Sequence, residues 1–243
     1  MSWIWVGCAV LIAYSIEAMT GFGSIVIALS LSALLFDIQS LVPVMVVLNI
    51  LMTGPLVVLH RAHIRWRLLF TIILPFILTG TLAGIALTPF IAAGWAKLLF
   101  SVLIIWFAWR AIRQKQPPQL ASAQRNALTT LAGITHGLFA SGGPLLVYAM
   151  ARAGLDKAGF RATMLTVWLT LNTGMTLWFF IEGALGSYTE QILWLTPCVI
   201  AGALAGNALH HRINEATFIR VIFRLLLLVG SLLFIQSLSH LIT

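Results

Sequence analysis

The chain has 243 residues, of which 60% are hydrophobic and 8% are charged, and its formal net charge is +8. A soluble domain is nearer half apolar and a quarter charged, so this chain has too few polar residues to cover a soluble globule. The composition excludes a soluble protein and indicates an integral membrane protein made of helices, because lipid leaves few other ways to satisfy the backbone. The basic residues gather in short loops, as the positive-inside rule predicts for a membrane protein. This rule explains the net positive charge better than nucleic-acid binding does.

The apolar segments, taken in chain order, predict an all-α polytopic membrane protein with about eight hydrophobic segments. Two segments, Trp3–Phe36 and Ala127–Ala153, are interrupted by helix-breaking residues. Six run without interruption and predict spanning helices, namely Leu41–Leu59, Leu68–Ile91, Ala96–Ile112, Thr163–Phe180, Ile192–Leu209 and Thr217–Leu238. The hydrophilic stretch "RQKQPPQLASAQRN" predicts a linker. It divides the chain into a first transmembrane half at 1–112, a basic cytoplasmic linker at 113–126 and a second transmembrane half at 127–243.

The two halves share a repeated sequence pattern. "PFILTGTLAG" at Pro75–Gly84 and "PCVIAGALAG" at Pro197–Gly206 have proline, glycine, leucine, alanine and glycine at the same five places. Asn49 in "VLNI" is matched by Asn172 in "TLNT" at nearly the same spacing. Because helix-breaking residues seldom match by chance, we interpret the pattern as a duplication.

Charged residues in the loops predict how the chain is oriented. Loops with Asp37, Glu182 and Glu190 lack Lys and Arg and are expected outside, because short cytoplasmic loops collect basic residues. The basic loops, expected in the cytoplasm, hold Arg61, Arg65, Arg67, Arg110, Arg113, Lys115, Arg125, Arg152, Lys157, Arg161, Arg212 and Arg220. Since basic loops flank Ala127–Ala153 on both sides, this segment is predicted to enter and leave on the cytoplasmic side.

A re-entrant hairpin, bent at Ser141–Pro144, fits the length of that segment. At about 1.5 Å per residue it is longer than a bilayer core of roughly 30 Å requires, yet short for two crossings. By repetition, Trp3–Phe36 is the same hairpin entering from outside. Each half then holds one broken hairpin and three transmembrane helices, and the odd number of crossings gives two inverted repeats. The alternative is eight ordinary spans with one tilted or kinked pair.

The break in "HGLFASGGPLLVYAM", at His136–Met150, predicts a binding site. Broken backbone at membrane depth is tolerated only where protein or a water-filled cavity surrounds it. Pro144 suits the first turn of a helix, and the preceding glycines let a ligand approach bare backbone. The helix that starts there directs free N–H groups and its positive dipole end at the break.

Gly21–Ser24 forms a similar break in the first half, and two half-helix N-termini that meet near the midplane predict an anion site. The candidate substrate-binding residues are Thr20, Gly21, Phe22, Gly23, Ser24, Asn49, Asn172, Ser141, Gly142, Gly143 and Pro144. Close packing of helices is the alternative role for the glycines, and interhelical hydrogen bonding is the alternative role for the two asparagines.

Glu17 and His136 precede the two breaks at equivalent positions, since they are separated by 119 residues, as are Gly23 and Gly142. Ionisable groups inside a membrane are functional candidates by default. Our hypothesis is that Glu17 and His136 approach each other near the anion site and relay or release a proton. In the alternative, each side chain caps its own broken helix or faces a water-filled entrance.

The sequence shows no enzymatic or cofactor motif. His-Glu-x-x-His, a Gly-x-Ser-x-Gly elbow and an acidic cluster are all absent from the 243 residues. We therefore predict a protein that is not an enzyme and that uses no metal and no cofactor. The remaining classes are a secondary transporter, an anion-selective channel with the same pore-lining donors, and a structural or sensory membrane protein.

Two glycine-rich motifs and one shorter element resemble the sulfite exporter TauE/SafE family of membrane proteins. "GLFASGGPLLVYAM" is similar to the Gly-rich motif of that family, "EAMTGFGSIVIALSL" is similar more weakly, and "GFRATML" at Gly159–Leu165 looks like its Ala-Thr element. Where the family usually shows Gly-Phe-Gly-Gly-Gly, often followed by proline, this chain has Ser24 and Ile25.

The resemblance implies a multi-pass protein of the bacterial inner membrane that moves sulfite, organosulfonates such as sulfoacetate, or related small anions, with coupling to the proton gradient. Its partners would be the small anion, protons and the lipid bilayer, and no nucleic acid. An unrelated small carboxylate remains an alternative substrate. The sequence leaves both export and import open as the direction of transport. It is also compatible with a homodimer.

Overall fold

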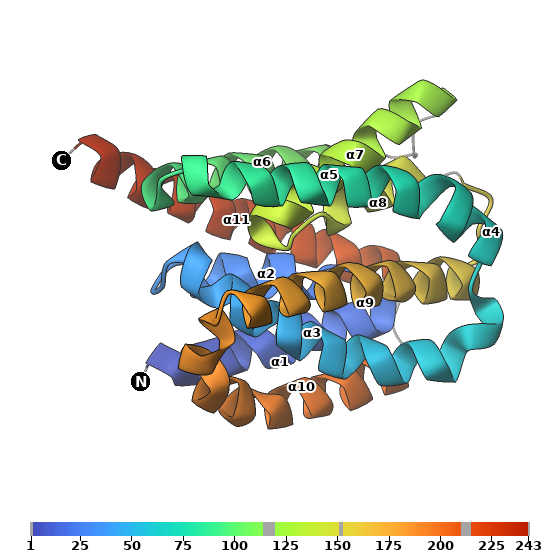
Figure 1. Ribbon diagram of the computed structural model, residues 1–243, viewed down its shortest axis with the longest axis horizontal. Coiled ribbons are helices and arrows are strands. Elements are labelled where there is room, and N and C mark those ends of the chain that lie inside the picture. The colour runs from blue at the N-terminus through green and yellow to red at the C-terminus, as the bar shows by residue number, and fades with distance from the viewer. Residues whose placement is uncertain (1, 114–119, 151–152, 210–214, 243) are drawn as a thin grey trace.

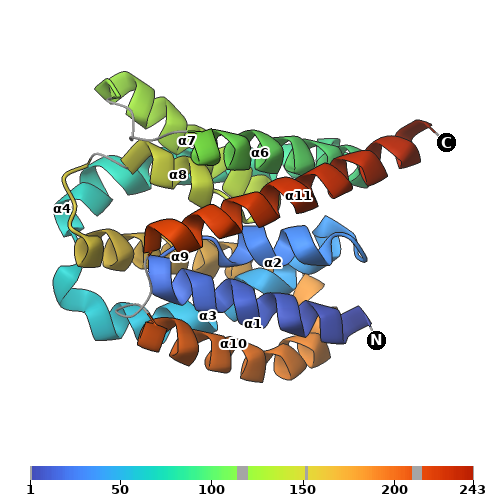
Figure 2. The same cartoon turned by 180° about the vertical axis from the view of Figure 1, so that it is seen from behind.

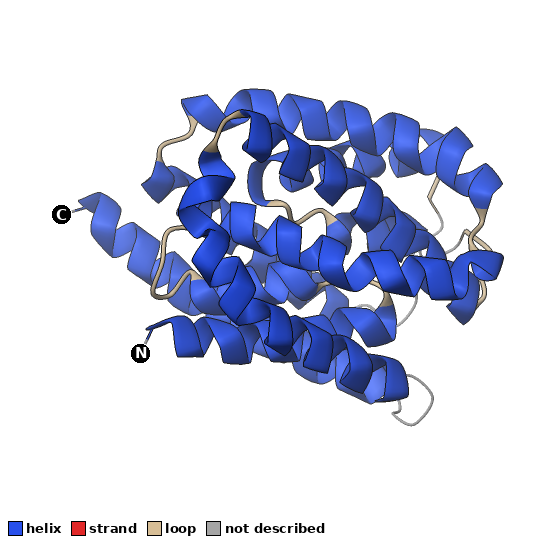
Figure 3. Cartoon of the chain, turned by 60° about the horizontal axis from the view of Figure 1, so that its bottom comes forward, coloured by secondary structure: helices blue, strands red, loops and turns tan. Residues whose placement is uncertain are grey.

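The structure is a computed structural model that describes residues 2–113, 120–150, 153–209 and 215–242. All regular secondary structure in these ranges is helical (Figure 3). Residues 114–119 of the predicted linker, with Lys115, and the basic residues Arg152 and Arg212 lie outside the described residues. Five of the described stretches are long and apolar enough to cross a membrane, namely Trp3–Thr20, Ile38–His63, Trp66–Phe90, Lys157–Ile181 and Ala184–Leu209. The predicted all-helical, multi-pass membrane protein is therefore confirmed.

The first half contains one broken helix pair followed by long helices. Its helices are α1 (Ser2–Thr20), α2 (Ser24–Ser32), α3 (Ile38–His60), the 3₁₀ turn η1 (Arg61–His63), α4 (Trp66–Leu68), the π-helical turn η2 (Leu69–Ile73), α5 (Leu74–Leu87), the 3₁₀ turn η3 (Thr88–Phe90) and α6 (Ala93–Arg113). The π-helical turn directly precedes Pro75, which has no N–H for a regular i→i−4 bond, so a local change of helical register is expected there.

The second half repeats this order of long helices and breaks. Its helices are α7 (Ser122–Phe139), α8 (Gly143–Met150), α9 (Lys157–Ile181), the 3₁₀ helix η4 (Ala184–Tyr188), α10 (Thr189–Leu209) and α11 (Glu215–Ile242). The short helices α2 and α8 both follow a break in a long apolar segment, as the sequence predicted. Figure 1 shows that α8 turns back along α7, and the helix order of the first half matches that of the second.

Backbone conformation explains the residue types at the breaks. In the first break Gly21 has φ 91° and Gly23 has φ 103°, a left-handed region that glycine enters at little cost. In the second break it is Ala140 that has a positive φ, of 50°, and its N–H donates to the carbonyl oxygen of His136 at 2.6 Å. A left-handed alanine is unfavourable and is found where the surrounding structure enforces it, so the turn at Ala140 is held by its packing.

The main helix contacts join the two halves. α1 packs against α10 and α5 packs against α7, so the first helix of each broken pair lies beside the third long segment of the other half. α3 packs against α9 and α6 packs against α11, which are the matching helices of the two halves. Figure 2 shows α10 alongside α1 and α11 crossing the face formed by α2 and α6. The set of pairs is unchanged when the two halves are exchanged.

The glycines of the repeated sequence lie at these contacts. In α5, Gly80 and Gly84 face Gly133 and Gly137 of α7, and a side chain at any of the four would collide with the backbone of the other helix. In α10, Gly202 and Gly206 face the backbone of α1 near Leu11 and Ser15. Small residues four apart let helix backbones approach closely in a membrane. The two repeated segments therefore serve the same purpose, which is to seat a broken helix of the opposite half.

The two ends of the molecule differ in charge. Both chain ends lie at one end of the bundle, and the loop that carries α4 lies at the other (Figure 1). At that second end Arg65 forms an ion pair with Asp156 at 3.0 Å, and both side chains are more than half exposed. The hydrogen bond from the Arg65 side chain holds the pKa of the Asp156 carboxyl below its usual value. An exposed pair of this kind adds little stability, but it ties together two loops that the sequence assigned to the cytoplasm.

We predict that Gly137→Ala destabilises the protein, because a methyl group there meets the α5 backbone at Thr81 and Ile85. Overpacking costs about 1–3 kcal/mol, which corresponds to a fall in Tm of roughly 2–12 °C. Gly174→Ala is the matched control, since nothing lies near that position, and its Tm should be equal to or above that of the parent. Thermal unfolding in detergent measures both, and equal Tm values for the two variants would contradict the packing.

Candidate functional site

The two breaks lie against each other inside the bundle. A Cβ atom placed on Gly143 of the second break would lie 3.8 Å from the backbone nitrogen of Gly23 and 3.9 Å from Cβ of Phe22. Trp168 of α9 also joins the breaks, because its Nε1–H donates to the carbonyl oxygen of Gly21 at 3.0 Å. The interruptions of the two halves therefore form one continuous region of irregular backbone.

A small polar cavity lies between the breaks. Its free volume is about 20 Å³, which is enough for one water molecule. The walls come from both halves of the chain and consist of Glu17, Gly23, Ile25, Val26, Asn49, Ala140, Ser141, Gly143, Pro144, Trp168 and Asn172. Seven of these eleven residues, namely Glu17, Gly23, Asn49, Ser141, Gly143, Pro144 and Asn172, are among the candidates proposed from the sequence. We call this space the polar cavity.

A chain of buried hydrogen bonds forms one wall of the polar cavity. Oε2 of Glu17 accepts from the backbone N–H of Ser24 at 2.8 Å, and Oε1 accepts from Nδ2 of Asn49 at 3.0 Å. Nδ2 of Asn49 also donates to Oγ of Ser24 at 3.0 Å. Nδ2 of Asn172 donates to Oδ1 of Asn49 at 2.7 Å. The two symmetric asparagines are thus bonded directly to each other across the halves, so interhelical hydrogen bonding is one of their roles.

This network makes the two helix N-termini chemically different. The N-terminus of α2 already has a ligand from the protein, since Oε2 of Glu17 accepts the N–H of Ser24, the first residue of that helix. At the N-terminus of α8, Pro144 has no N–H, and Gly143 and Leu145 lie in the first turn, where helices leave N–H donors without intrahelical partners. The open end is therefore that of α8.

His136 occupies the position in the second half that Glu17 occupies in the first, but its contacts differ. Its ring stacks on Trp168 with centroids 5.9 Å apart, and both ring nitrogens are buried without a hydrogen-bond partner among the described residues. In the same part of the chain no hydrogen bond or ion pair joins His136 to Glu17. His136 reaches the polar cavity only through Trp168, which separates it from the wall.

Two polar atoms in the walls of the polar cavity have no partner among the described residues. They are Oγ of Ser141 and Oδ1 of Asn172. A buried polar atom without a partner carries a penalty of about 1–3 kcal/mol, and a ligand that bonds to it removes that penalty. The Ser141 hydroxyl can donate to an anion, whereas the Asn172 oxygen can accept only from a protonated group or a water molecule.

Four of the predicted site residues lie away from the polar cavity. Thr20 and Phe22 line a separate apolar cavity, and Oγ1 of Thr20 donates to the carbonyl oxygen of Ile16 at 2.8 Å. Gly21 packs against the backbone of Arg161, and Gly142 packs against the α7 backbone at Ala132. These glycines permit close approach of protein backbone rather than of a ligand in this conformation.

Sequence reasoning missed four residues in the wall of the polar cavity, namely Ile25, Val26, Ala140 and Trp168. It also missed Arg161, which is buried beside the first break, with Nη2 donating to Oδ1 of Asn207 at 2.8 Å. The indole N–H of Trp168, in mid-span, was a signal that could have been used. Arg161 was assigned to a cytoplasmic loop from its charge, and only 4% of it is exposed. Its burial depends on packing against Gly21, which sequence spacing does not reveal.

A polar cavity enclosed by two broken helices in an all-helical membrane bundle is typical of a transport protein. The chain belongs to the sulfite exporter TauE/SafE family, whose model matches residues 6–234. It is therefore a multi-pass membrane transporter and not an enzyme. The two motifs that resembled this family lie at the polar cavity, so the resemblance extends to the centre of the fold.

Two relatives with assigned names are similar to most of the chain. The first, from Comamonas testosteroni, is named "Probable inner membrane transporter protein TsaS" and is 27% identical over 191 residues, which cover 75% of this chain and 80% of the relative. The second, from Cupriavidus necator, is named "Probable sulfite/organosulfonate exporter TauE" and is 25% identical over 183 residues, which cover 73% of this chain and 71% of the relative. No solved structure matches the chain.

We predict that Asn49→Leu and Asn172→Leu have different effects. Asn49 takes part in bonds to Glu17, Ser24 and Asn172, so its loss leaves several buried polar groups unpaired. Each such group costs about 1–3 kcal/mol, and the Tm of Asn49→Leu should fall by roughly 5 °C or more. Asn172→Leu removes one hydrogen bond, so its Tm should fall by a smaller amount. Thermal unfolding of both variants tests this prediction, and an equal fall in Tm would mean that Asn172 is also mainly structural.

Proposed function

We propose that the protein is a secondary transporter of small anions, most concretely sulfite or an organosulfonate such as sulfoacetate, and that the anion binds between the two helix N-termini. The observation that carries the proposal is the open N-terminus of α8, where Ser141 lines the polar cavity and its hydroxyl has no partner among the described residues. Helix N-termini favour anions through free N–H groups and the helix dipole. The name of the relative from Cupriavidus necator supports this substrate class.

Two inverted repeats, at residues 1–112 and 127–243, account for the architecture in this proposal. The contacts α1–α10 and α5–α7 exchange with each other when the halves are exchanged, and α3–α9 and α6–α11 each join matching helices of the two halves. Inverted repeats allow one half to rock against the other around a central site, which then opens to each side in turn. The water-sized free volume of the polar cavity fits a closed conformation between the two open ones.

The membrane potential supplies a driving force for export. An inside-negative potential favours expulsion of a monovalent anion by about 2.3 kcal/mol per 100 mV, which shifts the equilibrium about fiftyfold. Export of a monoanion therefore requires no proton, whereas import against this potential requires one or more. A channel would use the same potential, but inverted repeats with broken helices suit the rocking of one half against the other and favour a transporter.

Glu17 is the group to which we assign proton coupling. Its carboxylate shares the polar cavity with the proposed substrate, and it lies 2% exposed with Ser24 and Asn49 as partners. Two negative charges in one buried cavity repel each other, so uptake of a proton by Glu17 would accompany anion binding. His136 is a weaker candidate, because Trp168 separates it from the polar cavity.

Flux into proteoliposomes tests the proposed function. Sulfite, sulfoacetate, taurine, sulfate and acetate are offered with and without a pH gradient, and we expect saturable flux and counterflow for a sulfur oxyanion.

Gly143→Leu should abolish that flux, because its side chain meets Trp168 and fills the polar cavity. Gly174→Leu, on an open helix surface, is the control. Saturation without counterflow would favour a channel, flux of acetate alone would favour a carboxylate substrate, and normal flux in Gly143→Leu would reject the site.

We predict that Glu17→Gln removes the dependence of flux on the pH gradient, because glutamine takes up no proton in this pH range. Both oxygens of Glu17 accept hydrogen bonds and glutamine keeps one acceptor, so the variant should fold with a lower Tm. Glu182→Gln, which changes an exposed glutamate at the end of α9, is the matched control. The measurement is the ratio of initial rates with and without a pH gradient of one unit. If Glu17→Gln and His136→Asn both transport at the parent rate with unchanged pH dependence, neither residue carries the proton.

A further inference from the structure

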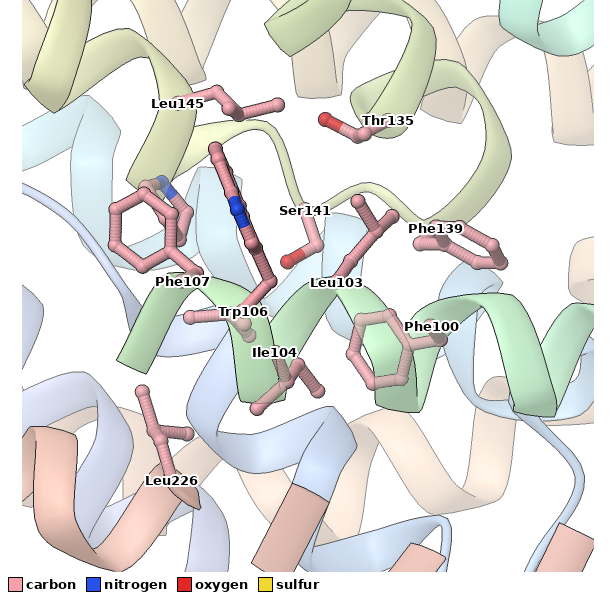
Figure 4. A pocket seen from close by; sticks show the side chains of 12 residues that line it. Phe100, Leu103, Ile104, Trp106, Phe107, Thr135, Phe139, Ser141, Leu145 and Leu226 are labelled. Atoms are coloured by element: carbon pink, nitrogen blue, oxygen red, sulfur yellow. The ribbon is translucent and has the colours of Figure 1, made fainter. Parts of the chain in front are cut away.

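The cavities at the two breaks have no basic side chain in their walls. Figure 4 shows the cavity between α6 and the α7–α8 break, whose wall is aromatic and aliphatic, with hydroxyls at Thr135 and Ser141. The polar cavity and the apolar cavity beside Thr20 likewise have no Lys or Arg among the described residues that line them. Any full positive charge that attracts an anion toward the breaks therefore lies outside these three cavities.

Arg161 is a buried cation beside the first break. Of the Lys and Arg side chains that the structure describes, it alone is buried, with 4% of the residue exposed. A Cβ atom placed on Gly21 would lie 2.8 Å from Cα of Arg161 and 3.3 Å from its Cγ. From this contact the side chain extends to α10, where Nη2 donates to Oδ1 of Asn207 at 2.8 Å. The guanidinium thus lies between the first break and α10.

No carboxylate balances the charge of Arg161 in the described part of the chain. The ion pair found there joins Arg65 to Asp156, and the Arg161 guanidinium is bonded to the neutral amide of Asn207. Nε of Arg161 is buried without a hydrogen-bond partner among the described residues. A buried charge is costly unless it is paired and hydrogen-bonded, and the C-terminal ends of α1 and α10 offset only part of this cost. A bound anion would supply the missing pairing.

Arg161 lies toward the end of the bundle that the sequence assigns to the cytoplasm. It follows Asp156, a member of the exposed ion pair at that end, by little more than one helical turn. Arg161, Trp168 and Asn172 share one face of α9, because seven and eleven residues are close to two and three turns. Trp168 and Asn172 line the polar cavity, so this face of α9 leads from Arg161 to the polar cavity over roughly 16 Å of helix rise.

We propose that Arg161 and Asn207 form a recognition site on the cytoplasmic side, which the anion occupies before it reaches the polar cavity. This inference rests on the proposed function and adds a residue that sets the affinity for the anion from one side of the membrane. A guanidinium presents a planar set of N–H donors that can bind two oxygens of an oxyanion at once. In this conformation the guanidinium is enclosed, and the anion reaches it when rocking of the halves moves the first break away from α9.

Asn207→Asp separates recognition of an anion from packing of helices. The variant places a carboxylate where the amide oxygen accepts from Nη2 at 2.8 Å, so the charge of Arg161 is balanced inside the protein. If Arg161 recognises the anion, this carboxylate competes with the substrate, and the KM from the cytoplasmic face rises about tenfold or more while the Tm stays equal or rises. If Arg161 only holds α9 to α10, the new ion pair leaves the KM unchanged.

Initial rates of sulfite and sulfoacetate flux in proteoliposomes, measured separately from each face at zero membrane potential, test the inference. Arg161→Gln should raise the KM from the cytoplasmic face about tenfold to a hundredfold and leave the KM from the outer face unchanged. Arg161→Lys keeps the charge without the planar donors, so its KM should fall between those of the parent and Arg161→Gln. Arg67→Gln, which changes an exposed arginine of α4 at the same end of the bundle, is the control for surface charge.

The outcomes separate this inference from the proposed function. If neither anion moves in the parent protein, the proposed function fails and this inference fails with it. If flux in the parent saturates, but Arg161→Gln and Asn207→Asp keep its cytoplasmic KM, only this inference is overturned. A fall in the maximal rate from both faces with unchanged KM values would show a structural role and would also overturn it.

A rise in the cytoplasmic KM in Arg161→Gln and Asn207→Asp, with the parent value in Arg67→Gln, supports the recognition site. An equal rise in the KM from both faces would place the effect at the central site and overturn the inference. If Arg161→Gln does not fold, Asn207→Asp alone decides, because it keeps the hydrogen bond between α9 and α10.

Discussion

The requirement that buried backbone groups be hydrogen-bonded governs this structure, because two helices are broken inside a membrane. The break at Gly21 is satisfied from the other half of the chain, where the indole of Trp168 donates to its carbonyl oxygen. Asn172 likewise reaches Asn49 across the halves and completes the shell around Glu17. The first break is thus completed by a donor from the second half, and the polar centre is assembled from both halves.

Packing at glycines lets helices of the two halves approach closely enough to form these hydrogen bonds. Backbone of α5 meets backbone of α7 along Gly80 and Gly84, and α10 meets α1 along Gly202 and Gly206. Van der Waals contact is the main attraction between helices in lipid, where the hydrophobic effect is absent. The same contacts seat α1 and α7 deep in the bundle and place the two breaks together, so stability and the polar cavity depend on one set of small residues.

The sequence predicted much of the fold because its signals are local. Apolar length identified the helices, Ser141–Pro144 and Gly21–Ser24 located both breaks, and the repeated proline and glycine segments marked equivalent helices. Side-chain pairing could not be predicted, because it depends on how helices distant in sequence are rotated toward each other. Thus Arg161 was assigned to a loop and is buried, and Glu17 was paired in hypothesis with His136 but is bonded to Ser24 and Asn49.

The carboxylate at the start of α2 acts as a tethered ligand. Because Glu17 and Ser24 are only seven residues apart, the carboxylate has an effective local concentration in the millimolar range or above, and a dilute free anion cannot compete with it there. The second half has no such internal competitor, since its equivalent residue is His136. Two halves with the same order of helices therefore have chemically different helix N-termini, one bound by its own carboxyl group and one beside a histidine.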